Sequence, residues 1–217
     1  VPSTARMFAL CDVLGGQSAT EWWELRFLVD SASNALVALP GRGDAFAPIT
    51  AIAPLLSGGS VHFPSTRAGF RDRLFGDAHF FRTYIAYLDT FSSEGWLEAL
   101  LRRMSDGYAV QERIVISEYP QSRPDASVFA HNREVITRTL RPPDLLLAYA
   151  QTSENTKREI AIANVHALPV EVTAYVIGTD TIPFATPFLI WPREPEKPLT
   201  YTPIRIALPR GDQAQLK

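Results

Sequence analysis

The chain has 217 residues, of which 46% are hydrophobic and 20% are charged, and its formal net charge is −2. A chain of this length and apolar content can bury a core for one large domain or two small ones. The weak net charge gives no basic field that would attract nucleic acid or an anionic membrane, so we expect neither partner.

Cysteine content and the first residues restrict the class further. Cys11 is the only cysteine, which rules out an internal disulfide, and its apolar neighbours predict a small buried side chain. No apolar run reaches the roughly 20 residues that a membrane span needs. The chain begins with "VPSTARMFALC", without an initiator Met and inside a predicted helix. We therefore expect a fragment of a longer protein.

The first forty residues predict a buried helix followed by a β-hairpin. The helix is expected to end at Gly15, the first of two glycines, because glycine adopts the left-handed backbone that terminates helices. Two short apolar runs separated by "SASN" then predict a hairpin over 21–40, with Leu25, Phe27 and Val29 on one face of its first strand. The apolar residues of the helix recur at helical spacing: Met7, Phe8, Leu10, Cys11 and Leu14.

Residues 41–69 are rich in Gly, Pro and Ser, and this composition predicts a long irregular connection. Three helices are predicted after it. The second should have Ser92 or Ser93 as its N-cap, and the third should begin at Asp125 and stop before Pro142. Their apolar stripes are Phe81, Tyr84, Ile85 and Leu88; Trp96, Leu97, Leu100, Leu101 and Met104; and Phe129, Val135, Ile136 and Leu140.

The periodicity changes near residue 142. Runs such as "REIAIANV", "VEVTAYVIG" and "TPIRIALP" alternate or are β-branched, and Pro, Asn, Asp and Gly separate them. Such runs are typical of an antiparallel sheet or a small sandwich. The predicted fold class is therefore α+β, with a helical part over 1–142 and an antiparallel β-sandwich-like domain over 143–217.

Several common catalytic motifs do not occur in the sequence. The four histidines lie in different predicted elements and there is no second cysteine, so zinc chemistry has little support. There is no G-x-S-x-G for acyl transfer, and neither G-x-x-x-x-G-K-[ST] nor G-x-G-x-x-G for phosphate binding. The first lysine is Lys157, so the helical part supplies no lysine to nucleotide phosphates.

One stretch resembles a known family. Read as a whole, "ARMFALCDVLGGQSATEWWELRFLVDSASNALVALPGRGD" looks like the C-lobe core of the spore-coat CotH-type atypical protein kinases of bacteria. The family pattern is a helix ending in Leu-Leu-Gly, a catalytic Asp, an Asn opening an aromatic strand, a turn, and a strand ending in Pro-x-Asp-x-Asp. Two later stretches, "FRDRLFGDAHFFRTYIAYLDTF" and "IAIANVHALPVEV", also look like the sequence that follows in family members. The resemblance implies that the helical part is a kinase-like C-lobe portion.

The resemblance also implies where the chemistry would lie. In this family the Asp-x-Asp and the Asn bind the Mg²⁺ that bridges nucleotide phosphates, and the catalytic Asp aligns or deprotonates the acceptor hydroxyl. Here the catalytic position falls on Ser18 and the Asn position on Glu24, while the Asp-x-Asp falls on Arg42 and Asp44. Glu24 and Asp44 are thus the candidate metal ligands, and Ser18 is expected to be inactive as a base.

Arg42 is the substitution with the largest electrostatic consequence. At an effective dielectric of ~20, two unit charges about 4 Å apart interact by ~4 kcal/mol, so an Arg at a ligand position opposes the cation. We expect loss of the metal, with Arg42 forming an ion pair with Glu24 or Asp44 instead.

Four other side chains have alternative interpretations. Asp12 is a candidate replacement acid, although we expect a surface carboxylate. Trp22 and Trp23 could form an aromatic platform on which a sugar or base stacks. We expect instead that one of the two rings packs in the core. Arg71 is expected to lie on an exposed charged helix face.

Three hypotheses for function remain. In the first, the chain is the C-terminal fragment of a CotH-type kinase-like protein, a pseudokinase that needs no cofactor and acts as a scaffold or binding module for a protein partner. In the second, it is an active metal-dependent kinase in which Glu24 and Asp44 hold Mg²⁺ for ATP, an upstream lobe supplies the lysine and the glycine-rich loop, and a protein is the substrate. In the third, it is a non-enzymatic cell-surface module whose β domain binds carbohydrate or protein. An exported or cell-envelope location is implied by the resemblance alone.

The tripeptide Arg-Gly-Asp occurs twice, at 42–44 and at 210–212. The third hypothesis would have both copies exposed as adhesion loops, but tripeptides recur by chance too readily to identify an adhesion ligand. We interpret the first copy as the altered end of the metal-binding strand.

Overall fold

The computed structural model describes residues 2–32, 35–40, 47–56, 69–118, 120, 125–154, 157–193 and 197–207. These residues form six α-helices and several antiparallel sheets, so the predicted α+β class is confirmed. The described residues up to Arg141 form one compact unit, the helical unit, and those from Pro142 onward form a second, the β unit. None of the described helices is both long and apolar enough to cross a membrane.

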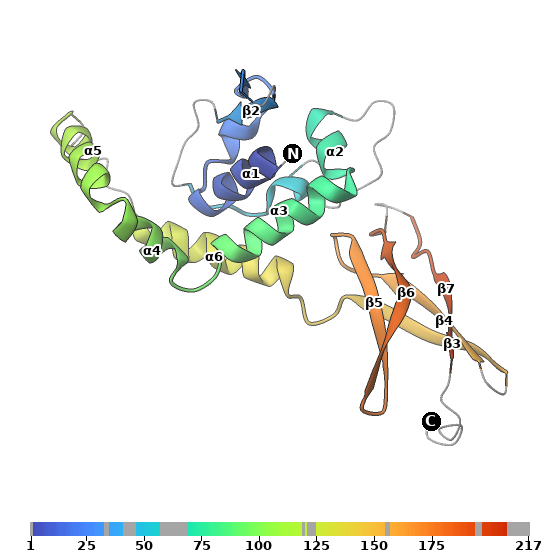
Figure 1. Ribbon diagram of the computed structural model, residues 1–217. Helices are drawn as coiled ribbons and strands as arrows, with labels where there is room; N and C mark the ends of the chain where they lie inside the picture. Colours follow the sequence, from blue (N-terminus) through green and yellow to red (C-terminus); the bar gives the residue numbers. More distant parts are fainter. Residues whose placement is uncertain are drawn as a thin grey trace. The chain divides into compact units, whose positions relative to one another are not determined.

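The core of the helical unit forms where α1 (Pro2–Leu14) packs against α3 (Ala78–Phe91) and α6 (Ala126–Leu140), as Figure 1 shows. Phe8 of α1 is fully buried, and its ring meets those of Phe75 and Phe80 edge-on at 5.6 Å and 6.1 Å. Phe75 ends the short helix α2 (Phe70–Phe75). Edge-to-face packing of aromatic rings is favourable, so this cluster joins three helices.

The predicted end of α1 and both predicted ends of α6 are confirmed, whereas the predicted start of α4 is not. The Asp125 side chain accepts a hydrogen bond from the N–H of Ser127 at 2.9 Å, which confirms it as the N-cap of α6. The predicted serine cap of α4 (Trp96–Arg103) is wrong. The residue before α4 is Gly95, whose φ of +76° is a backbone conformation that serine rarely adopts.

Two exposed helices follow α3. No residue of α4 is buried, so its predicted stripe does not form core. The next helix, α5 (Ser105–Glu118), was not predicted, and none of its described side chains is buried. These two helices add little to the core.

Two 3-10 turns and a β-hairpin complete the helical unit. The turns are η1 (Gln17–Thr20) and η2 (Ala53–Leu55), and the strands are β1 (Arg26–Asp30) and β2 (Ala35–Leu39). The strands pair antiparallel, which confirms the predicted hairpin. Leu25 precedes β1 and is buried, whereas all five residues of β1 are exposed.

The β unit contains two separate antiparallel sheets. The first has the order β3–β4–β7 and the second pairs β5 with β6. Their bounds are β3 (Leu146–Glu154), β4 (Lys157–Asn164), β5 (Val170–Ile177), β6 (Asp180–Ile190) and β7 (Thr202–Ala207). The buried amide of Asn164 on β4 joins the sheets, because its Nδ2 donates to the carbonyl of Ile190 on β6 at 3.0 Å. The antiparallel prediction is confirmed for this part of the chain.

Candidate functional site

A tight turn ends α1 just before Ser18, the position of the expected catalytic residue. At Gly15 φ is +70°, and an added Cβ would lie 1.9 Å from the carbonyl oxygen of Ala47. The N–H of Ala47 also donates to the carbonyl of Gly15 at 3.3 Å. Only glycine fits this turn, both because of its φ and because another backbone segment touches it. The turn therefore fixes the described segment 47–56 against the end of α1.

Asp12 lies directly under this turn and is the centre of a buried polar network. Its carboxylate is 0% exposed and accepts hydrogen bonds from the Tyr84 hydroxyl and from Nε2 of Gln17. The backbone N–H of Ala53 donates to both carboxylate oxygens, at 3.1 Å and 3.2 Å. Gln17 also donates to the carbonyl of Ala51 at 2.7 Å. The expectation that Asp12 is a surface carboxylate was wrong, because its donors lie on three segments that close over it.

The electrostatics of this network follow from its burial. Removal from water raises the pKa of Asp12 from 3.8 to about 6, although the hydrogen bonds from Tyr84, Gln17 and Ala53 lower it. Burial first, and the adjacent Asp12 carboxylate second, raise the pKa of Tyr84 well above 10. The tyrosine therefore remains a hydrogen-bond donor near neutral pH.

A second buried side chain fastens the same segment from the other side. Asn132 of α6 is 0% exposed, and its Oδ1 accepts from the N–H of Ile49 at 2.9 Å. Its Nδ2 donates to the carbonyls of Val13 at 3.3 Å and Ala47 at 3.2 Å. Nε2 of the adjacent His131 lies 3.1 Å from the carbonyl oxygen of Ile49. Asp12 and Asn132 together hold α1, α3, α6 and segment 47–56 in one arrangement.

An ion pair covers the outer side of the turn. Arg71 of α2 lies 2.7 Å from Glu21, and their side chains are 14% and 33% exposed. The same guanidinium donates to the hydroxyl of Thr20 at 3.4 Å. The prediction of an exposed charged face was wrong for Arg71, because its guanidinium contacts Glu21 and Thr20 and its side chain is largely buried. This pair joins α2 to the residues that follow η1.

The structure places Ser18 and Glu24, two of the predicted site residues, in one continuous series of turns. Ser18 is exposed within η1, and its carbonyl accepts from the N–H of Glu21 at 3.2 Å. Glu24 is half-buried, and its N–H donates to the carbonyl of Glu21 at 2.9 Å. Arg42 and Asp44 lie outside the described residues, as does the second tripeptide at 210–212. Within the described ranges, no three His, Cys, Asp or Glu residues form a group that could hold a metal ion.

Both predicted tryptophans lie on the surface. Trp22 is 61% exposed and Trp23 is 70% exposed, so the expectation that one ring packs in the core was wrong. Trp22 instead rests against Phe70 at the start of α2, with ring centroids 4.9 Å apart. The Phe27 ring of β1 meets Phe70 edge-on at 6.4 Å. Trp22, Trp23 and Phe27 are thus exposed aromatic residues near the start of the hairpin, with the buried Leu25 between them.

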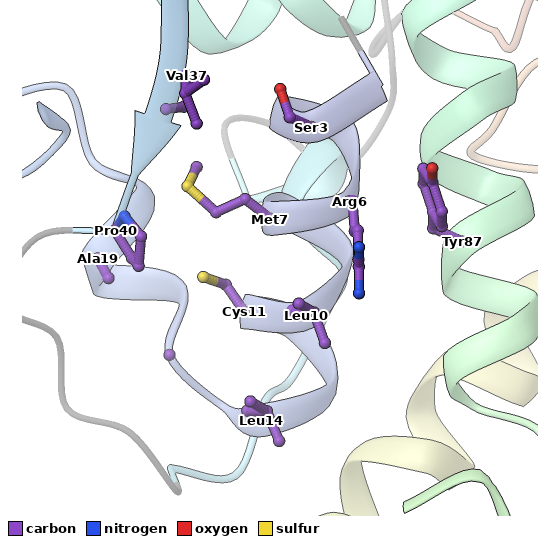
Figure 2. A pocket seen from close by; sticks show the side chains of 12 residues that line it. Ser3, Arg6, Met7, Leu10, Cys11, Leu14, Ala19, Val37, Pro40 and Tyr87 are labelled. Atoms are coloured by element: carbon purple, nitrogen blue, oxygen red, sulfur yellow. The ribbon is translucent and has the colours of Figure 1, made fainter. Parts of the chain in front are cut away.

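An apolar groove of about 700 Å³ runs along α1 beside the turn. Figure 2 shows Met7 and Cys11 pointing toward Val37 and Pro40, whereas Arg6 lies on the side of α1 that faces Tyr87. Burial raises the pKa of the Cys11 thiol to about 12, and the side chain is only 8% exposed, which confirms it as a small buried apolar residue. The groove has the size and apolar lining typical of a small-ligand site.

The β unit has a smaller cleft of about 280 Å³ at the end of β6. Its lining combines an aromatic ring, two cationic side chains and two hydroxyl groups: Trp191, Arg193, Lys197, Thr200 and Thr202. Asn164 forms its floor, where its Oδ1 accepts from the N–H of His166 and its Nδ2 donates to the carbonyl of Leu168 at 2.7 Å. Such a mixture can stack on a sugar ring and bind its polar substituents.

The network residues had a signal in the sequence. On a helix, Ala5, Phe8 and Ala9 share one face with Asp12, and all of them are buried. Asn132 likewise precedes the buried pair Val135 and Ile136 by three and four residues. A polar residue within a buried stripe was therefore the signal that the sequence interpretation missed.

Comparisons with protein-family models, with curated proteins and with solved structures find no match to this chain.

Proposed function

We propose that this chain is the C-terminal part of a CotH-type kinase-like protein that acts as a binding module and does not transfer phosphate. In this proposal the helical unit is the kinase-like C-lobe portion, the two sheets of the β unit pack as a small sandwich, and the protein works in an exported or cell-envelope setting. The burial of Asp12 is the observation that carries the proposal.

A catalytic base must come within hydrogen-bond distance of the hydroxyl proton that it removes. Asp12, the candidate replacement acid, is 0% exposed and accepts hydrogen bonds from Tyr84, Gln17 and Ala53. It therefore serves to hold the turn in place. Ser18, at the family's catalytic position, presents a hydroxyl that is not a base at neutral pH.

Two surfaces of the helical unit support a binding role. The groove along α1 is about 700 Å³ and is lined mostly by apolar side chains. The hairpin exposes Leu28, Val29 and Leu36 at 57%, 67% and 63%. Val29 and Leu36 face each other across the two strands and form one exposed apolar patch, and such patches can mark interaction sites.

The proposed loss of phosphoryl transfer is tested on the full-length protein. Calorimetry measures the binding of Mg·ATP, and labelled ATP measures autophosphorylation. Both are carried out on the wild type and on the variants Asp44→Ala and Glu24→Gln. We expect no transfer and no effect of either substitution. Transfer that Asp44→Ala abolishes would instead establish the active metal-dependent kinase.

The groove is tested with the amphipathic anionic dye 8-anilino-1-naphthalenesulfonate, whose fluorescence rises in an apolar site. Leu10 lines the groove, so we expect Leu10→Glu, which places a negative charge there, to weaken binding of the dye strongly. Dye fluorescence that is the same in the wild type and in Leu10→Glu would contradict a binding role for the groove.

The cleft of the β unit favours a second candidate function, the binding of carbohydrate. An aromatic ring beside cationic and hydroxyl groups suits a sugar that carries a carboxylate or sulfate. Binding to an array of neutral and acidic glycans is the test, with Trp191→Ala expected to abolish it and Tyr175→Ala, in β5, as the aromatic control. Equal binding by the two variants would place the glycan elsewhere.

A further inference from the structure

The outer edge of β1 is the least protected part of the hairpin. Among the described strands β1 pairs only with β2, so one side of its backbone has no strand partner. β2 packs against α1, whereas all five residues of β1 are exposed. Natural proteins usually protect such an edge with proline, lysine or a bulge, because its free N–H and C=O groups form a template for another strand. β1 contains no proline or lysine, its register with β2 is regular, and its only charged residues are Arg26 and Asp30 at its two ends.

The sequence of this strand, Arg-Phe-Leu-Val-Asp, is complementary to itself when it is read in reverse. An antiparallel pair of two β1 strands centred on Leu28 would place Arg26 opposite Asp30 at both ends. It would also place Phe27 opposite Val29 twice. Opposite charges and aromatic–β-branched pairs are favourable when they face each other across antiparallel strands. No other register of the five residues matches both kinds of pair.

We propose that a second copy of this chain docks on the outer edge of β1, so that two hairpins join in one four-stranded sheet of order β2–β1–β1–β2. The pairing is isologous, since the same strand contributes from both copies, and it closes as a dimer. It concerns the hairpin alone and does not depend on whether the chain is kinase-like.

Side-chain alternation supports the pairing. Leu28 lies on the same face of β1 as Arg26 and Asp30. In the dimer the two Leu28 side chains would therefore lie opposite each other, with one Arg26–Asp30 pair on either side of them. Phe27 and Val29 lie on the opposite face, where Phe27 already contacts Phe70. The Arg26 guanidinium donates to the carbonyls of Trp23 and Leu25 at 3.1 Å and 3.2 Å and must turn outward to reach the second copy. The Asp30 carboxylate already accepts from the N–H of Ala32 at 3.0 Å, so the new ion pair must share it. Because a five-residue edge is short compared with a stable interface, we expect a weak dimer.

Sedimentation velocity of the full chain over a concentration series, up to the solubility limit, tests the proposal. We expect the mass to rise from 24.1 kDa toward twice that value. Leu28→Lys places two like charges opposite each other on the two-fold axis and should raise the dimer Kd about a hundredfold or more. A mass that stays at one chain at every concentration overturns the proposal.

Charge exchange tests the register itself. Arg26→Asp and Asp30→Arg should each raise the dimer Kd about tenfold, because each places like charges opposite each other twice. The double variant, and a mixture of the two single variants, should recover wild-type association, since both restore opposite pairs.

Matched controls are Arg138→Asp on α6 and Val176→Lys on β5, which change an exposed Arg and an exposed Val far along the chain from β1. Neither should alter the Kd. Dimerisation that Leu28→Lys leaves intact, or single charge variants that the double variant does not rescue, would overturn the proposed pairing.

Discussion

The end of α1 and the hairpin that follows it belong to the same unit and lie within thirty residues of each other, yet they are built in opposite ways. At the end of α1 the polar groups of Asp12 and Asn132 are fully buried and each accepts or donates several hydrogen bonds. Among the described residues no buried side-chain nitrogen or oxygen lacks a partner. In the hairpin, by contrast, the apolar side chains of Leu28 and Val29 face solvent.

This difference indicates which of the two regions tolerates substitutions. Buried polar groups that lose a partner keep their desolvation cost, so the network has to stay complete. An exposed apolar residue loses little when it is replaced, so the hairpin is free to serve a partner. Stability should therefore depend on the network, and association on the hairpin.

The strongest test removes the centre of the network. Asp12→Ala removes the acceptor of the Tyr84 hydroxyl and of the Ala53 N–H and leaves Gln17 with only the carbonyl of Ala51, so we expect it to lower the free energy of unfolding by about 4 kcal/mol. Leu28→Lys in the hairpin should change it by less than about 0.5 kcal/mol. Urea denaturation followed by circular dichroism measures both. Similar losses in the two variants would contradict the contrast between the regions.

The pH dependence of stability tests the state of the Asp12 carboxyl. Its pKa is raised from 3.8 to about 6 in the folded chain, so the folded chain binds this proton more tightly than the unfolded chain. The resulting stabilisation is complete below pH 3.8 and is lost as the pH rises through 6, which amounts to about 3 kcal/mol.

Asp12→Asn has no such proton and keeps one acceptor oxygen, so it isolates this effect. The free energy of unfolding of the wild type, relative to that of Asp12→Asn, should fall by about 3 kcal/mol between pH 3 and pH 7. Urea denaturation at a series of pH values measures the difference. Parallel profiles for the two proteins would show that the pKa of Asp12 is not raised.

The turn over the network is tested by two glycines that share a positive φ. At Gly15 an added Cβ would meet the backbone of Ala47, whereas at Gly95 nothing lies within 4 Å. Gly15→Ala should lower the free energy of unfolding by at least about 2 kcal/mol, and Gly95→Ala by only about 1 kcal/mol, the cost of φ alone. Thermal or urea denaturation compares them. Equal losses would mean that the contact with Ala47 adds nothing.

The smallest expected effect on stability is the difference between substitutions of the two exposed tryptophans. Trp22→Ala removes a ring that touches Phe70 and should lower the free energy of unfolding by about 1 kcal/mol. Trp23→Ala removes a ring that is 70% exposed and should cost less than about 0.5 kcal/mol. Urea denaturation measures the free energy of unfolding of both variants. A larger loss for Trp23→Ala than for Trp22→Ala would contradict the prediction.

Local signals in the sequence predicted much of the secondary structure. The glycine at the end of α1, the Asp125 cap of α6 and the alternating runs of the β unit each act within a few residues, so they can be recognised without a tertiary structure. Helix α5 was missed because its sequence has no clear apolar stripe, and its described side chains are not buried.

The candidate site was predicted less well. The sequence interpretation placed Asp12 and Arg71 on the surface and one tryptophan in the core. Whether a side chain on a short element is covered depends on which segments pack over it, and those segments come from distant parts of the chain. Asp12 is covered by Ala53 and Tyr84, which follow it by 41 and 72 residues.

The sequence by itself determined the elements of this protein, its α+β class and the self-complementary order of charges in β1, since all of these depend on neighbouring residues. Only the tertiary structure decided that Asp12 is buried, that the groove forms beside it and that β1 pairs with β2 alone among the described strands. These features depend on contacts between segments far apart in the chain, and the free energy of those contacts comes from desolvation and packing rather than from local preference.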